Sequence, residues 1–230
     1  MTFLELAQRL AAESGTLPGV GQPASVIGQI SRAANIVSWI RQSLEQVENE
    51  RTDWLFMQEE FEGETAIDAR RYTAAAWNLT SFSEWLNAQA NTRAFSIFAN
   101  SIGRVDERPL TFIEWQRFYE TQLRGEPTRG YPTYFTVSPK GEFCLSPLPD
   151  AVYTVRGLYR LGPQALTANT DVPRMPARHH MVIVWHALVR LAIYDEAVVQ
   201  EPRFRDQYRD TMDALIRDQT PSFSIGGPLA

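Results

Sequence analysis

Three histidines are the residues of this sequence with the clearest chemical potential. His179, His180 and His186 fall at the start of an apolar segment that we predict to be helical. His179 and His186 share a helix face but lie two turns apart, whereas helical zinc sites use an i, i+4 pair. For His180 beside Asp150 or Asp171, no Gly-x-Ser-x-Gly turn supplies a serine nucleophile. We therefore expect carboxylate pairing at the helix start, with no catalytic residue and no metal.

Acidic residues gather in two short runs, at residues 59–64 and 195–196. Paired carboxylates serve glycosidases and nucleases, but a general acid needs a raised pKa, and nothing in either run supplies one. Phosphate chemistry has no better candidate, because the glycine-rich stretch 15–21 lacks the lysine of a P-loop. We interpret the acidic runs as solvated faces and expect no cofactor.

Composition is that of an ordinary globular protein. The chain has 230 residues, 44% of them hydrophobic and 21% charged, which argues against wholesale disorder. Cys144 is the single cysteine, which excludes an internal disulfide or a thiolate metal cluster, and we interpret it as a small packed hydrophobe. No leader pattern opens the sequence, and the apolar run 181–194 is too short to span a bilayer. We therefore expect a soluble protein with no membrane partner.

The charge distribution bears on possible partners. The net charge of −5 arises entirely within residues 1–110, while residues 111–230 are balanced. Because no basic stripe is present, sequence-specific nucleic-acid binding is not expected. The cations comprise one lysine, Lys140, and 21 arginines. Arginine suits interface ion pairs, although a coding preference for arginine codons accounts for the same bias.

The first half of the sequence predicts two helices. Thr2 and Glu5 form a capping-box pattern for a helix that ends near Ser14. Pro23 suits the first turn of a long helix over residues 23–48. Its apolar positions recur at alternating spacings of four and three: Val26, Ile30, Ala33, Val37, Ile40, Leu44 and Val47. This heptad seam is typical of a core helix, or of one shared with a neighbouring subunit.

The second half predicts strands followed by a helix pair. We expect a short helix over 81–91, another over 111–123, and a strand meander at 134–137, 142–145 and 152–161 with prolines at its turns. An apolar helix over 177–194 and an amphipathic one from residue 201 then pack antiparallel. The fold class is therefore α+β: a helical bundle with a small, mostly antiparallel sheet. The simplest organisation is one compact domain, 1–219, followed by an extended tail, 220–230.

The order of these segments resembles the head-to-tail adaptor, or connector, proteins of tailed bacteriophages. The resemblance rests on the following passages: Ile36–Ile40, Asp53–Phe56, Arg108–Phe112, Pro132–Phe135, Leu145–Asp150, Leu158–Arg160 and Asp171–Pro176, followed by the helix from His180. It is strongest over 127–196 and thinnest over 64–107. The order of the passages carries it, since no single motif is specific.

The resemblance implies a structural role without enzymatic activity. It implies a homo-oligomeric ring, typically dodecameric, that docks beneath the portal protein, offers a platform to tail or stopper proteins, and lets genomic double-stranded DNA pass without reading its sequence. Such a protein belongs in the virion neck and, during assembly, in the host cytoplasm. An alternative in the same class is a head-completion or stopper protein. A hydrolase whose site is assembled from residues distant in sequence is the rival from another class.

Two sets of residues are candidates for contacts. The resemblance implies that a C-terminal segment inserts against the portal, and the apolar residues of the tail, Phe223, Ile225 and Leu229, are the expected anchors. The heptad pattern makes Val26, Ile30, Val37, Ile40 and Leu44 the expected subunit-interface positions on the long helix.

Overall fold

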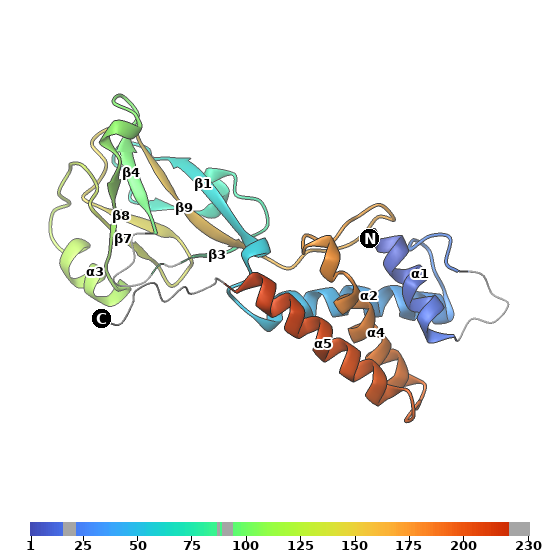
Figure 1. Cartoon of the computed structure of the whole chain (residues 1–230). Helices are drawn as coiled ribbons and strands as arrows, with labels where there is room; N and C mark the ends of the chain where they lie inside the picture. Colours follow the sequence, from blue (N-terminus) through green and yellow to red (C-terminus); the bar gives the residue numbers. More distant parts are fainter. Residues whose placement is uncertain (16–21, 87, 89–93, 221–230) are drawn as a thin grey trace, which may run out of the picture. The chain divides into compact units, whose positions relative to one another are not determined.

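The chain folds into two compact units in the computed structural model (Figure 1). The structure describes residues 1–15, 22–86, 88 and 94–220. Residues 1–57 and the segment from Pro163 form one unit, here called the helical unit, and residues 58–162 form the other, the sheet unit. Each encloses its own hydrophobic cluster, where we had expected one compact body. The sheet unit is inserted in the sequence between the two segments of the helical unit. No stretch rich in glycine, serine or proline marks either boundary. Folding of residues 1–219 as one domain stays a prediction.

The helical unit is built around one apolar helix. Its elements are α1 (Phe3–Ser14), α2 (Ser31–Glu50), η1 (Leu55–Met57), η4 (Ala177–His179), α4 (Met181–Tyr194) and α5 (Glu201–Gln219). The predicted capping box is present, since the side chains of Thr2 and Glu5 each accept a hydrogen bond from the other's backbone N–H. α4 contacts α1, α2 and α5, which explains why its sequence is apolar on nearly every face. The predicted helix pair, α4 with α5, is confirmed.

The long helix begins eight residues later than its sequence pattern predicts. Between Pro23 and Ser31 the backbone is irregular, and Gly28 and Ser31 have positive φ angles of 68° and 52°. The Asn169 side chain holds this segment, because its Oδ1 accepts a hydrogen bond from the Val26 backbone N–H at 2.7 Å. A left-handed residue cannot lie in the interior of a right-handed helix, so α2 does not extend back beyond Ser31, its first residue.

The sheet unit contains two small sheets. The first has the order β1-β9-β4-β5, with β3 also paired to β9, and the second has the order β2-β8-β7-β6. The strands are β1 (Gln58–Glu64), β2 (Arg71–Tyr72), β3 (Phe82–Trp85), β4 (Ser96–Ala99), β5 (Arg108–Pro109), β6 (Thr111–Phe112), β7 (Tyr134–Val137), β8 (Phe143–Ser146) and β9 (Tyr153–Leu161). The remaining helical segments are η2 (Ala74–Trp77), η3 (Arg104–Asp106) and α3 (Trp115–Gln122). The pairings are antiparallel except β6 with β7. The α+β class and the mostly antiparallel sheets are confirmed.

Three local expectations in this unit are wrong. The predicted meander does not form, because β7 and β8 pair in one sheet whereas β9 pairs with β1, β3 and β4 in the other. Residues 82–85 form strand β3 in place of the predicted helix over 81–91. The helix predicted from residue 111 starts at Trp115, because Thr111 and Phe112 pair with β7. In each case pairing with a distant strand overrides a local pattern.

Aromatic rings fill the core of the sheet unit, and two glycines make room for them. Gly63 of β1 lies against the ring of Trp77, and Gly157 of β9 lies against the ring of Phe95. A Cβ atom added at either glycine would overlap the facing ring. Phe95 has no exposed surface and contacts other rings, so it has nowhere to move. Close packing of the aromatic core thus requires glycine at both positions.

We expect Gly157→Ala to destabilise the sheet unit by about 1–3 kcal/mol, because the methyl group forces Phe95 out of its packed position. Urea unfolding followed by tryptophan fluorescence measures the loss. Gly162→Ala is the matched control, since its Cβ would meet only the Ser81 carbonyl oxygen, at an ordinary 3.5 Å. Equal stability of the two variants would contradict the packing argument.

Candidate functional site: contact surfaces

The predicted subunit-interface positions lie mostly inside the helical unit. Val37, Ile40 and Leu44 on α2 are 0–4% exposed and belong to its hydrophobic cluster. Val26, in the segment before α2, is also buried, at 3%. Ile30 immediately precedes α2 and is 79% exposed. Of the five positions, therefore, Ile30 alone presents its side chain at the surface of the described chain. The heptad pattern corresponds to a core seam within the unit, and a subunit contact through it stays a prediction.

The predicted portal anchors lie outside the described residues. Phe223, Ile225 and Leu229 follow Thr220, the last residue that the structure describes. α5 ends at Gln219, whose side chain is 9% exposed and accepts a hydrogen bond from the Phe56 backbone N–H at 3.2 Å. The described chain is thus anchored in the helical unit up to the residue before the tail.

Exposed large hydrophobic side chains, three aliphatic and one aromatic, gather where α4 turns into α5. Ile193, Tyr194, Val198 and Val199 are 60–86% exposed, and we call these four residues the apolar corner. Asp195 at the same turn accepts a hydrogen bond from Arg32 Nη1 at 2.9 Å, which ties the corner to the first turn of α2. Exposed Ile30 is two residues before Arg32. Clustered exposed hydrophobic side chains are a feature of protein contact surfaces, and the heptad analysis overlooked this cluster because it lies at a helix end.

His179 and His180 bond to neighbouring parts of the fold. His180 is buried, and the Met1 amine donates to its Nδ1 at 2.7 Å while its Nε2–H donates to the Met175 carbonyl at 3.0 Å. His179 Nε2 lies 3.2 Å from Asp218 Oδ2, which is the carboxylate pairing expected at the start of the helix. Burial lowers the pKa of His180, so it is held as neutral imidazole.

His186 and Ser43 form the one histidine–hydroxyl pair in the described chain, at 2.9 Å between Nδ1 and Oγ. The hydroxyl residue has no exposed surface and the imidazole residue is only 8% exposed. Burial and the nearby Arg190 lower the pKa of His186 to about 4. A buried hydroxyl that water cannot reach cannot receive a substrate, so this pair is part of the core and lacks the open pocket that a hydrolase needs.

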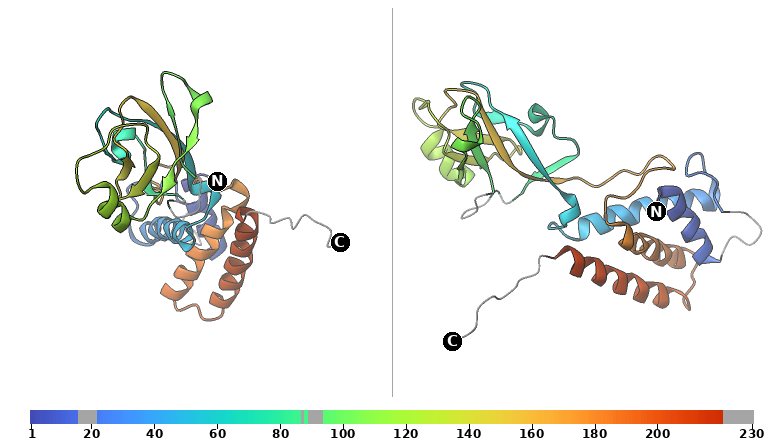
Figure 2. Two further views of the ribbon diagram at one scale, coloured as in Figure 1. Left: turned by 90° about the vertical axis from the view of Figure 1, so that its left-hand side faces the viewer. Right: turned by 45° about the horizontal axis from the view of Figure 1, so that its top comes forward.

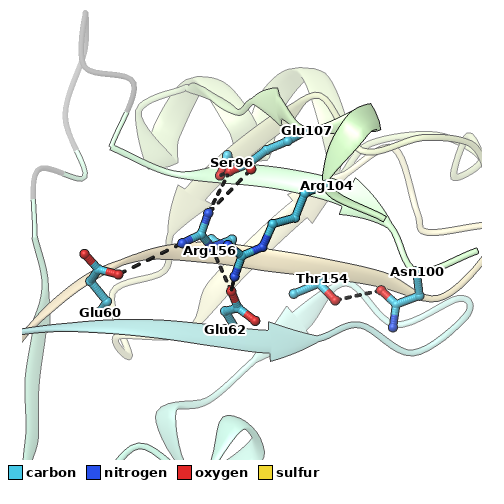
Figure 3. Close-up of polar contacts among 8 residues, drawn as sticks. All are labelled: Glu60, Glu62, Ser96, Asn100, Arg104, Glu107, Thr154 and Arg156. Atoms are coloured by element: carbon cyan, nitrogen blue, oxygen red, sulfur yellow. Dashed lines mark hydrogen bonds and ion pairs between the residues drawn. The ribbon is translucent and has the colours of Figure 1, made fainter. Parts of the chain in front are cut away.

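A charged network covers one face of the first sheet, centred on Arg156 of β9 (Figure 3). The Arg156 guanidinium lies 2.9 Å from Glu62 and 3.4 Å from Glu107, and Glu60 is at 4.0 Å. These residues converge because the sheet register places Glu62 of β1 and Ser96 of β4 directly opposite Arg156 on either side. The arginine thus balances part of the acidic charge that strand β1 carries on this face.

Further polar contacts extend the network along the sheet. Arg104 donates to Glu62 at 2.5 Å, and Ser96 Oγ donates to Glu107 at 2.5 Å. Asn100 bridges the neighbouring strands: its Oδ1 accepts from the Thr154 hydroxyl, and its Nδ2 donates to Glu64. We interpreted residues 59–64 as a solvated acidic face, and their alternating exposure on β1 accounts for it. The alternation of glutamates with Phe61 and Gly63 is the signal that indicates a strand here.

In two cavities of the described chain, the lining residues include no nucleophile paired with a base. One, of about 300 Å³, lies on the charged face beside Glu60, Glu62 and Arg156. The other, of about 450 Å³, lies in the helical unit between Arg41 of α2 and the segment 163–167. In the first, the Ser96 hydroxyl already bonds Glu107, and no histidine lines either cavity. Neither arrangement pairs a nucleophile with a base.

The cysteine and the possible metal ligands of the described chain also provide no reactive site. Burial raises the pKa of the Cys144 thiol to about 11, which keeps it protonated and unreactive. Among the described residues, no group of three or more histidine, cysteine, aspartate or glutamate side chains is placed to hold a metal ion. None of the described helices is both long and apolar enough to cross a membrane.

The structure therefore defines an α+β protein whose notable surfaces, within the described residues, are a charged sheet face and an exposed apolar corner, both suited to contacts with other proteins. Comparison with protein families shows the family to which the chain belongs. The family model of the SU10 adaptor proteins matches residues 1–230, so the chain belongs to this family of phage head-to-tail adaptors. Its place is accordingly the virion neck. A comparison with curated proteins found no match.

Proposed function

We propose that this adaptor assembles as a homo-oligomeric ring, typically of twelve copies, docks beneath the portal protein and carries tail or stopper proteins on its other side. Family membership over the whole chain is the observation that carries the proposal. The proposed role is structural, without catalysis and without a cofactor. The lack of an accessible nucleophile–base pair among the described residues supports this view. In the host cytoplasm, the chain would await a portal before assembling.

The C-terminal tail is the proposed portal contact. Residues 220–230 carry Phe223, Ile225 and Leu229 between glycines, prolines and serines. Such a segment can bury apolar side chains in a groove of a partner while adopting an extended backbone. The anchoring of α5 up to Gln219 supports this role, because the tail then leaves a fixed point of the helical unit.

The proposed subunit contact is the apolar corner together with Ile30. The heptad residues that we expected at the interface are buried within their own unit, so a neighbouring copy would have to use exposed side chains nearby. Interfaces of permanent homo-oligomers are more apolar than the rest of the surface. The four corner residues supply such a surface.

Aspartate at Val198 and Val199 should prevent ring formation without unfolding the chain. The two side chains are 80% and 86% exposed, so the monomer loses little packing, whereas a contact would have to desolvate two carboxylates. Mass photometry of the chain mixed with portal measures the size of the assembly. Val105→Asp is the matched control, since Val105 is 96% exposed in the sheet unit. A full ring from the Val198→Asp/Val199→Asp variant would remove the corner from the interface.

The proposed channel would be electrostatically repulsive to DNA. A dozen copies at −5 each would carry −60 formally. At physiological salt this repulsion acts over about 8–10 Å, which keeps passing phosphates from adhering but does not drive movement. The charge balance therefore supports passage without sequence-specific binding.

Co-purification with the neighbouring portal protein, followed by electron microscopy of the complex, tests the proposal as a whole. We expect a ring of adaptor copies bound to the portal. If this chain instead bound only to a portal that already carries another adaptor protein, and not to the portal alone, its role would be that of a stopper or head-completion protein.

A further inference from the structure

Strand β1 forms a long unpaired edge of the first sheet (Figures 1 and 2). Its seven residues pair with β9 on one side, and no described strand pairs with the other side. At the opposite edge of the sheet, β5 has only two residues, and one of them is Pro109, which has no backbone N–H. Strand β3 also pairs only with β9 among the described strands, but it has four residues. β1 is therefore the longest edge of this sheet in the described part of the chain.

The backbone groups of β1 alternate in direction, and two contacts identify which ones point outward. The Thr65 N–H donates to the Tyr153 carbonyl, so the odd-numbered residues face β9. The Glu64 carbonyl accepts from the indole Nε1 of Trp77, which shows that the even-numbered residues face away from β9. Antiparallel pairing alternates in this way at every residue.

Glu60 and Glu62 consequently direct their N–H and C=O groups to the outer edge. No hydrogen bond within the described part of the chain joins these four groups to another backbone group outside the β1–β9 pairing. The Glu64 carbonyl already accepts a hydrogen bond from the Trp77 indole N–H. The unpaired part of the edge is therefore centred on residues 60–62. An extended segment placed there gains main-chain hydrogen bonds without displacing any bond of the sheet.

The side chains along β1 restrict what can pair with it. Its glutamates stand at positions 59, 60, 62 and 64, and the strand contains no cation. The Glu60 side chain is 81% exposed and that of Glu62 is 46% exposed, although Arg104 and Arg156 pair with the latter. Pairing of β1 with β1 of a second copy would place glutamates opposite glutamates, which is destabilising. An incoming strand with arginine or lysine at alternate positions would gain cross-strand ion pairs.

We propose that the outer edge of β1 at Glu60–Glu62 binds an extended basic segment of another protein, which joins the first sheet as an added strand. The open backbone groups provide affinity, and the exposed carboxylate of Glu60 selects a cationic partner. This inference goes beyond the proposed function, since it requires neither the C-terminal tail nor a ring.

The test uses the full chain and a synthetic seven-residue peptide that alternates arginine with threonine and valine. We expect fluorescence anisotropy to show saturable binding, and hydrogen exchange to show new protection of the Glu60 and Glu62 amides. The Phe61 and Gly63 amides, already bonded to β9, should be protected before the peptide is added. The same peptide with alternate backbone amides N-methylated keeps every charge but cannot pair, and it should not bind.

Variants separate charge from backbone pairing. Glu60→Gln should weaken binding about two- to fivefold by removing one exposed ion pair. Glu60→Pro also removes an outward N–H while leaving the bonds to β9 in place, and it should abolish binding. Glu126→Gln, an exposed site away from β1, is the matched control. Equal binding of the N-methylated peptide, or no binding to a folded chain, would overturn the proposal. The proposal would also be overturned if the Glu60 and Glu62 amides were protected from exchange before the peptide is added because the chain self-associates. That result would mean that a second copy of the chain occupies the edge of β1.

Discussion

Deletion of residues 220–230 is expected to abolish portal binding and to leave the fold intact. The described core ends at Gln219, which bonds to Phe56, so removal of the tail costs only the hydrogen bonds of exposed Thr220 to the Ile216 carbonyl among the described contacts. Each of the three tail anchors can contribute about 1.5–3 kcal/mol if it is fully buried in the portal. Loss of all three would then reduce affinity by several orders of magnitude. Co-purification with the portal measures binding, and urea unfolding measures the fold.

Point variants show whether portal binding depends on the three apolar side chains or only on the presence of a tail of this length. Phe223→Ala, Ile225→Ala and Leu229→Ala should each weaken portal binding about tenfold or more. Ser222→Ala and Ser224→Ala are the matched controls within the same segment and should bind as the unchanged protein does. Unchanged portal binding by the tail-deleted chain would remove the tail from the interface and leave the described surfaces as the remaining candidates.

Acidification from pH 7 to pH 4.5 is expected to destabilise the helical unit through His186. Its pKa is about 4 in the folded chain, against 6.5 ordinarily, because burial and Arg190 disfavour the imidazolium. The unfolded state therefore binds more protons between these values, so the contribution is complete above pH 6.5 and is lost as the pH falls toward 4. The full shift corresponds to about 3 kcal/mol. His180, whose pKa is also lowered, adds in the same direction.

The measurement is the free energy of unfolding in urea at several pH values between 4.5 and 7. His186→Gln keeps a hydrogen-bonding group near Ser43 but does not titrate, so its stability should fall less on acidification. Ser43→Ala is the control, because it removes the hydroxyl partner while leaving the imidazole buried, and its acid sensitivity should persist. Acid sensitivity of His186→Gln equal to that of the unchanged protein would show that His186 is not the responsible group.

Local patterns predicted the helical unit better than the sheet unit, for a physical reason. The capping box of α1, the apolar α4 and the amphipathic α5 depend on residues three or four positions apart, and these were correct. The pairing of β9 with β1, β3 and β4 joins residues that are far apart in the sequence, from Ala99 with Tyr153 to Gln58 with Arg160. No periodicity encodes such a pairing, so the predicted meander and the helix over 81–91 were wrong.

The candidate contact surfaces show the same division. The heptad seam correctly marked the apolar positions of α2, yet an apolar stripe has the same sequence whether its own unit or a neighbour covers it. The fold buries Val37, Ile40 and Leu44 under α4 and its neighbours and leaves Ile30 and the apolar corner exposed. The acidic run was evident in the sequence, whereas its position on an unpaired edge follows only from the sheet topology.

The sequence by itself determined the α+β class, the helix pair and, through the order of its segments, the resemblance to head-to-tail adaptors that the family match confirms. These properties are local or additive along the chain, so they can be read without coordinates. Tertiary structure alone decided which apolar residues remain exposed, which long strand lies at a sheet edge and that His180 and His186 are buried. Each of these depends on which distant segments cover a residue, and only the folded chain brings those segments together.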